Sequence, residues 1–66
     1  MNLIPGQLYI PRKNVYLYGE DDDQYLYSFN EPLLFFKHDA YQLIFWYDNH
    51  WYYCLYETHH NQFEEF

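Results

Sequence analysis

Short runs of apolar and aromatic residues follow one another along the chain, separated by turn residues and charged residues. Tyr, Phe, Trp, Ile and Val dominate these runs, and such side chains fit a pleated sheet. No long stretch shows apolar residues at the i, i+3, i+4 and i+7 positions of an amphipathic helix. The pattern therefore predicts an all-β protein.

Turn-forming residues and charge runs separate the expected strands. Pro5-Gly6 and Asn30-Glu31-Pro32 are turn sequences, and the acidic run from Glu20 to Asp23 predicts an exposed loop because its charges repel one another. We expect the segment 24–29 to return beside 15–18 as an irregular hairpin. The remaining strands are expected at 7–10, 33–36, 41–47, 50–56 and 62–66, with a polar break at 37–39 and one 3₁₀ turn at 58–61.

The clearest element is the hairpin over 41–56, which turns at Asp48-Asn49. Both turn residues tolerate positive φ, so a two-residue type I′ turn is expected. The register that follows pairs Tyr47 with His50, Trp46 with Trp51, Phe45 with Tyr52, Ile44 with Tyr53 and Leu43 with Cys54. One face then carries Ile44, Trp46, Trp51, Tyr53 and Leu55, and the other carries Tyr41, Leu43, Phe45, Tyr47, His50, Tyr52, Cys54 and Tyr56. An ordinary half-exposed hairpin has one polar face, so the second apolar face is expected to be covered or functional.

The order of these elements suggests a small barrel. Val15-Tyr16-Leu17-Tyr18, then acids, then Leu26-Tyr27-Ser28-Phe29 is similar to the start of true SH3 domains, which read Ala-Leu-Tyr-Asp-Tyr, an acidic loop and Glu-Leu-Ser-Phe. The resemblance implies a single domain over 1–66, folded as a small five-stranded SH3-like barrel with a long acidic loop and one 3₁₀ turn. The strands would be 8–10, 33–36, the two arms of the hairpin and 63–66, with 15–18 and 25–29 as arms of the long loop.

Two family motifs are replaced in this chain. Glu31-Pro32 stands where SH3 domains have a Gly-Asp pair, and His59-His60-Asn61 stands in place of the Ser-Asn-Tyr turn that completes their proline-peptide groove. The resemblance therefore implies a fold and does not extend to the proline-peptide function of the family.

Net charge and aromatic content limit the function classes and the size of the core. The chain has 66 residues, of which 27% are aromatic, and a net charge of −7. A conventional nucleic-acid binder needs a basic face, so direct binding to nucleic acid is excluded. A domain this short has a core too small for ten Tyr, six Phe and two Trp. Some aromatic side chains must therefore lie on the surface or at an interface.

The expected compartment follows from what the sequence lacks. One cysteine excludes an intramolecular disulfide scaffold. No segment approaches the roughly 20 apolar residues of a membrane span, and no signal peptide is evident. We therefore expect a cytoplasmic protein that contacts no membrane. Small free-standing proteins of this composition are common among bacteriophage gene products, and by that analogy the compartment would be the host cytoplasm.

Catalytic and metal-binding motifs are not found. Cys54 is expected mid-strand, too far from His50 for the direct contact that an activated thiol needs. The histidines His38, His50, His59 and His60 lack the short Cys/His spacing of a zinc site. The acidic run lacks the spaced Asp pattern and distal Glu of a calcium loop. The sequence predicts no enzyme, no bound metal and no cofactor.

Protein binding is the function class that remains. We interpret the chain as a small acidic interaction module, an adaptor or inhibitor that binds a basic or proline-containing segment of a partner protein through an aromatic face and an acidic loop. The predicted partner-binding residues are Tyr16, Tyr18, Asp21, Asp22, Asp23, Trp46 and Trp51. A solvated loop that merely keeps the protein soluble would explain the acids equally well.

Two alternatives of other classes stay open. The net charge of −7 could imitate a phosphate array and occupy a host nucleic-acid-binding protein. The second apolar face of the hairpin could instead be buried against copies of the same chain, as in a homo-oligomer. Salt separates the first alternative from an aromatic interface, because a mimic loses its partner steeply as salt rises.

Overall fold

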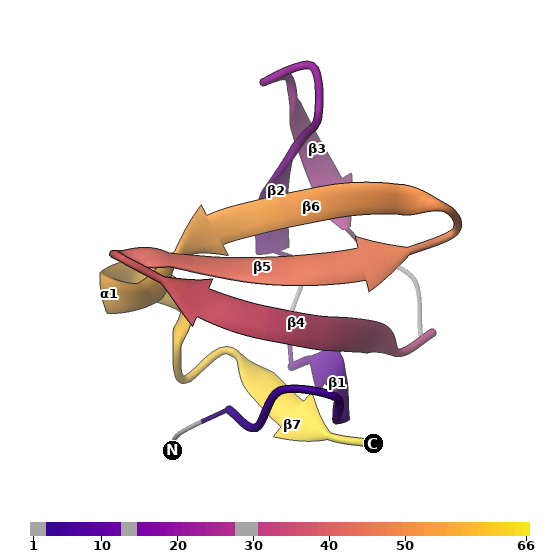
Figure 1. The fold of residues 1–66 in the computed structure, drawn as a ribbon, viewed down its shortest axis with the longest axis vertical. Coiled ribbons are helices and arrows are strands. Elements are labelled where there is room, and N and C mark those ends of the chain that lie inside the picture. Colours follow the sequence, from indigo (N-terminus) through magenta and orange to yellow (C-terminus); the bar gives the residue numbers. More distant parts are fainter. Residues whose placement is uncertain (1–2, 13–14, 28–30) are drawn as a thin grey trace.

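The computed structural model describes residues 3–12, 15–27 and 31–66, which form one curled antiparallel sheet and a single helical turn (Figure 1). The sheet has seven strands in the order β3-β2-β6-β5-β4-β1-β7. The elements are β1 (Leu8–Pro11), β2 (Val15–Gly19), β3 (Gln24–Tyr27), β4 (Leu33–Asp39), β5 (Gln42–Tyr47), β6 (His50–Leu55), α1 (Tyr56–His59) and β7 (Phe63–Glu65). The predicted all-β class is confirmed.

The central hairpin β5–β6 forms as its sequence predicts. Asp48 and Asn49 have φ values of 50° and 63°, so both turn residues are in the left-handed region that a type I′ turn requires. Each of the predicted cross-strand pairs from Tyr47 opposite His50 to Leu43 opposite Cys54 is observed. The register sends Leu43, Phe45 and Cys54 to the interior and their neighbours to the outer face.

The acidic run joins a regular hairpin rather than an irregular one. β2 and β3 pair continuously from Val15 opposite Tyr27 to Tyr18 opposite Gln24. β2 also pairs with β6, through Tyr18 opposite Tyr53 and Gly19 opposite Tyr52. The hairpin is thus an extension of the main sheet and rises above β6 in Figure 1. Residues 28 and 29 of the predicted strand, and residue 30 of the predicted turn, lie outside the described residues.

The predicted polar break at 37–39 is wrong, because β4 continues to Asp39. Pairing with β5 supplies the backbone partners there, with Lys37 opposite Ile44 and Asp39 opposite Gln42. The polar side chains are tolerated because they remain exposed at the end of the strand. The register shifts between Phe35 and Lys37, which makes Phe36 the extra residue of a β-bulge.

The five-stranded SH3-like barrel is not confirmed. The two arms expected to belong to a long loop are full strands of the sheet, since their backbone groups find partners in each other and in β6. The 3₁₀ turn predicted at 58–61 is also wrong. One α-helical turn, α1, begins at Tyr56 instead, and His60 N–H donates to the Tyr56 carbonyl oxygen at 2.9 Å.

The core is small and rich in aromatic rings. Phe45 lies at its centre, with ring centroids 5.4 Å from Phe35 and 4.7 Å from Phe63. The buried residues of the described segments are Tyr9, Val15, Leu17, Leu33, Phe35, Leu43, Phe45, Cys54 and Phe63. Phe63 closes the core, whereas Phe66 is 67% exposed. Positions three apart in an extended chain face opposite sides, so the two rings cannot both point inward.

We expect Phe45→Ala to lower the free energy of unfolding by about 3–5 kcal/mol, because it leaves a cavity between two other rings. Urea denaturation followed by tryptophan fluorescence measures the change. Phe66→Ala is the matched control and should shift the free energy of unfolding by less than about 0.5 kcal/mol. Equal effects of the two substitutions would contradict this placement of the core.

Candidate functional site

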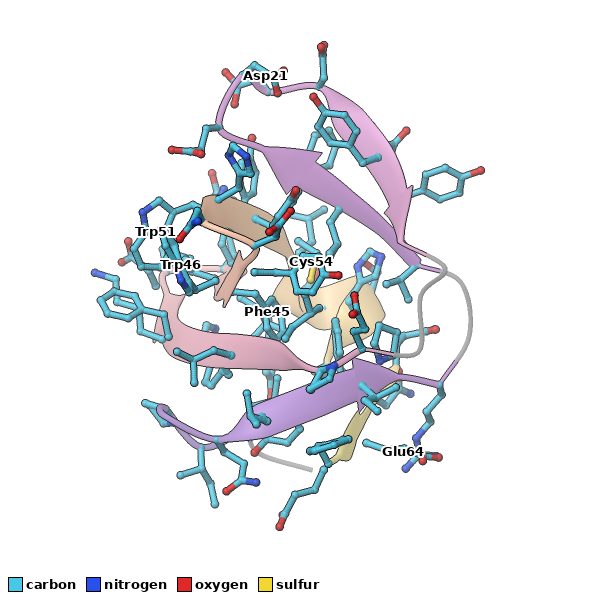
Figure 2. The ribbon with its side chains drawn as sticks, turned by 90° about the vertical axis from the view of Figure 1, so that its right-hand side faces the viewer. Asp21, Phe45, Trp46, Trp51, Cys54 and Glu64 are labelled. Atoms are coloured by element: carbon cyan, nitrogen blue, oxygen red, sulfur yellow. The ribbon has the colours of Figure 1, made fainter. Side chains whose placement is uncertain are left out.

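An aromatic cluster covers the outer face of the central strands β4, β5 and β6. The Trp51 ring lies 4.6 Å from Trp46 and 5.0 Å from Phe36 between centroids. Figure 2 shows both tryptophans on the outer side of the ribbon, whereas Phe45 and Cys54 lie inside it. Phe36 is 48% exposed and Trp51 is 37% exposed, so the cluster is open to solvent.

A groove of about 330 Å³ runs along this face, and we call it the aromatic groove. Its lining residues are Glu20, Phe36, Gln42, Ile44, Trp51, Tyr52 and Tyr53. Most of these side chains are apolar or aromatic, and Glu20 is the one charged residue among them. Such a site buries apolar surface and orients a ligand with few polar groups.

The acidic hairpin turn reaches the aromatic groove through Tyr53. The Tyr18 and Tyr53 rings stack at 5.4 Å with an interplanar angle of 20°. The Tyr53 hydroxyl donates a hydrogen bond to Asp22 Oδ1 at 2.7 Å. This bond favours the protonated phenol and raises the pKa of Tyr53. Asp22 is therefore held at the margin of the groove.

Glu20, the first residue of the acidic run, contacts the start of β6. Its Oε1 atom lies 3.2 Å from His50 Nδ1 and accepts a hydrogen bond from the Trp51 backbone N–H at 3.4 Å. Pairing between β2 and β6 ends at Gly19 opposite Tyr52, so the Glu20 carboxylate takes the place of the next strand residue. The Glu20 carboxylate thus accepts a backbone hydrogen bond at the edge of β6 and also lines the groove.

Asp21 faces the β3 side of the turn. Its Oδ2 accepts a hydrogen bond from the Tyr25 hydroxyl at 2.7 Å, and its Oδ1 accepts one from the Asp23 backbone N–H at 3.2 Å. The bond from Tyr25 is the main reason that the pKa of Asp21 is lowered. The same bond raises the pKa of Tyr25 to about 12. Both Asp21 oxygens accept hydrogen bonds within the turn, so Asp21 stabilises the turn as a brace.

Gly19 lies where this turn begins, under the ring of Tyr25. A Cβ atom at that position would lie 2.7 Å from Cε2 of Tyr25, closer than real Cβ contacts allow. The missing side chain lets the Tyr25 ring pack across the backbone and reach Asp21. Gly19 N–H closes the turn by donating to the Asp23 carbonyl oxygen at 2.9 Å.

A second hollow of about 300 Å³ adjoins the aromatic groove on the hairpin side. Gly19, Glu20, Asp21, Tyr25, His50, Trp51 and Tyr52 line it. Glu20, Trp51 and Tyr52 line both hollows, so the two lie next to each other on either side of these residues.

The predicted partner-binding residues divide into two groups. Tyr18, Asp22, Trp46 and Trp51 belong to the aromatic face or its margin. Tyr16 is exposed further along β2, Asp23 is exposed in the turn, and Asp21 braces that turn. Of the residues that line the groove, only Trp51 was among the predicted partner-binding residues; the others, missed by sequence reasoning, are Glu20, Phe36, Gln42, Ile44, Tyr52 and Tyr53. Glu20 follows Gly19 in the same acidic run, which was a usable signal, whereas the bulge that presents Phe36 leaves no mark in the sequence.

Other reactive groups lie apart from this surface. The Tyr56 ring stacks between His38, at 4.4 Å, and His60, at 4.8 Å. Cys54 is buried in the core, and desolvation raises the pKa of its thiol to about 12. Within residues 3–12, 15–27 and 31–66, no three His, Cys, Asp or Glu side chains are grouped so that they could hold a metal ion.

Comparisons with known protein families, with characterised proteins and with solved structures find no match to this chain. Over the described part of the chain, no helix has the length and apolar character needed to cross a membrane.

We expect Tyr25 to ionise with a pKa of about 12 rather than its ordinary 10.0, because the phenol donates to Asp21. Its contribution to stability is present below pH 10.0 and is lost as the pH rises through about 12. Asp21 has the opposite sign: its contribution is present above pH 3.8 and is lost as the pH falls through its lowered folded pKa.

NMR titration of the ¹³Cζ resonance of Tyr25 measures this ionisation. Asp21→Ala should return the pKa of Tyr25 toward 10.0. Glu65→Ala, at an exposed acid of β7, should leave it unchanged. A wild-type Tyr25 that titrates at its ordinary pKa would show that the brace does not form in solution.

The buried thiol of Cys54 should be inert in the folded protein. Burial keeps reagents out and disfavours the thiolate, which is the nucleophilic form. We expect an aromatic disulfide reagent at pH 8 to label the native protein far more slowly than the urea-unfolded protein. Similar labelling rates in both states would contradict the burial of this strand.

Proposed function

We propose that this protein is a small interaction module, an adaptor or inhibitor, that binds a partner protein through the aromatic groove and its acidic margin. The observation that carries the proposal is the placement of Phe36 and Trp51, two large exposed rings in contact, in one groove with the Glu20 carboxylate. Asp22 accepts a hydrogen bond from Tyr53 of the same lining. The proposed activity is binding rather than catalysis.

Energetics favour this surface as a contact site. Trp and Tyr are frequent hot spots because they bury much area and lose little conformational entropy. Here the rings lie on paired strands, so the backbone beneath them is already ordered. Burial of apolar area contributes about 25 cal/mol per Å² to the free energy of binding, so a partner that covers the aromatic groove is favoured.

Charge favours a basic partner segment. The chain carries a net charge of −7, and Glu20 and Asp22 place part of it next to the aromatic rings. Complementary charge raises the association rate and rejects acidic partners. A segment with positive charges and apolar side chains matches both features of the surface, and a proline-containing segment remains compatible with it.

The acids are distributed less favourably for a nucleic-acid mimic. Asp21 lies at one end of the molecule and Glu64 at the other in Figure 2, with the aromatic strands between them. Glu64 also lies 3.5 Å from Arg12, so part of that charge is neutralised. A phosphate-like track would need regularly spaced acids along one continuous surface.

Affinity capture from a lysate tests the proposal, with the wild type beside Trp51→Ala and Asp22→Asn at low salt and at roughly 0.5 M salt. Asn tolerates the positive φ of Asp22, 63°, so that variant removes charge with little backbone strain. Phe66→Ala is the matched control, an exposed aromatic residue just beyond β7.

We expect one enriched protein that survives high salt, is lost with Trp51→Ala, is weakened by Asp22→Asn and is kept with Phe66→Ala. A nucleic-acid-binding partner lost at high salt would favour the mimic. If no partner is captured and the melting temperature rises with protein concentration, self-assembly would replace the proposal.

A further inference from the structure

We infer that the aromatic groove is a site for an arginine side chain of the partner protein, with the guanidinium plane on the rings of Trp51 and Phe36 and its N–H groups directed to Glu20 and Asp22. This inference rests on the proposed function and deepens it, because it names the group that enters the groove. The surface combines two features that bind this side chain, solvent-exposed aromatic rings and carboxylates near them.

The aromatic part of the site is geometrically suited to a flat cation. The Phe36 and Trp51 rings meet at 64° with centroids 5.0 Å apart, so they form two adjoining walls rather than one closed stack. Ile44 and Tyr53 complete an apolar lining, and the volume of about 330 Å³ accommodates a side chain of arginine size. Stacking a guanidinium on a ring excludes water from its faces and leaves its edge free to donate.

The carboxylates supply acceptors at the margin of the groove. The hydrogen bonds of Glu20 within the described residues use Oε1, and those of the Asp22 side chain use Oδ1. Each carboxylate therefore keeps an oxygen, Oε2 or Oδ2, that can accept from a ligand. Bonds from a guanidinium to carboxylates are charge-assisted and stronger than neutral ones.

The protein itself places a cation on this aromatic surface. Lys37 Nζ lies 5.7 Å from the centroid of the Phe36 ring, a cation–π contact. The same ammonium lies 4.0 Å from Asp39, at an exposed position beyond the groove. The residues that line the groove include no Lys or Arg, so no internal cation fills it.

Charge selects this occupant over a second copy of the chain. Two copies would bring net charges of −7 together, with Glu20 and Asp22 of each near the contact. Arginine is favoured over lysine because its planar fork can stack and donate at once, whereas an ammonium is a compact, strongly hydrated charge.

The test uses a soluble Gly/Ser-rich peptide that contains one arginine, and matched peptides in which citrulline or lysine replaces it. Citrulline keeps the shape of arginine and removes its charge. Binding is followed by ¹H–¹⁵N NMR of the full chain, which reports each tryptophan indole separately. We expect the arginine peptide to shift the Trp51 indole signal and to bind about tenfold more tightly than the citrulline peptide, as charge-assisted stacking predicts.

Variants assign the contact to the groove. Glu20→Gln keeps an oxygen that can accept from the Trp51 N–H, so the edge of β6 is preserved while the charge is removed. We expect it to weaken the arginine peptide by about three- to tenfold. Glu65→Gln is the control, since it removes one exposed acid from β7 and should leave the affinity unchanged.

Several results would overturn the inference. Equal affinity for the arginine and citrulline peptides would do so, as would tighter binding of the lysine peptide or equal effects of Glu20→Gln and Glu65→Gln. If the lysate partner depends on Trp51 but the arginine peptide does not bind, the inference fails and the proposed function stands. If neither binds and the NMR signals of the groove broaden with protein concentration, both fail in favour of self-association.

Discussion

The two-residue turn at Asp48-Asn49 is the constraint on which the rest of the structure depends. Its left-handed residues fix the register of β5 against β6, and register alone decides which side chains point inward. With Phe45 inside, Trp46 and Trp51 must lie on the outer face. The core and the candidate site are therefore two consequences of one backbone arrangement.

The size of the core explains why so much aromatic surface is left outside. Phe35, Phe45 and Phe63 fill the centre, and the same strands have no further interior to offer. A chain of 66 residues cannot enclose both faces of its central hairpin. The acidic hairpin covers part of the outer face through Tyr18 and leaves the rest as a groove.

Local patterns predicted the parts of the fold that local forces determine. The turn, the cross-strand pairs and the surplus of surface aromatics follow from residue type and period, so they could be predicted from sequence. The sequence could not show that the two segments that flank the acidic run, β2 and β3, join the main sheet. Whether they do so depends on whether β6 has a free edge. The five-stranded SH3-like barrel is not confirmed for this reason: it treats β2 and β3 as arms of a loop, whereas they continue the sheet.

The candidate site also combines features that sequence indicates with features that it does not. Tyr18, Asp22 and the two tryptophans could be proposed from sequence because they are aromatic or acidic, and the structure places them on the aromatic face or at its margin. The different roles of neighbouring acids were not visible. Asp21 turns toward Tyr25 and Asp22 toward Tyr53, and these directions depend on the positive φ of one turn residue.

Glu20 has a consequence for the behaviour of the protein at high concentration. β6 extends past the end of β2, so its first residues have an unpaired side where another chain could add a strand. The Glu20 carboxylate accepts from the Trp51 N–H on that side and carries a negative charge there. An approaching copy meets a like charge and a backbone donor that is already occupied. The edge of β6 that carries the exposed Trp51 is thereby guarded against edge-to-edge aggregation.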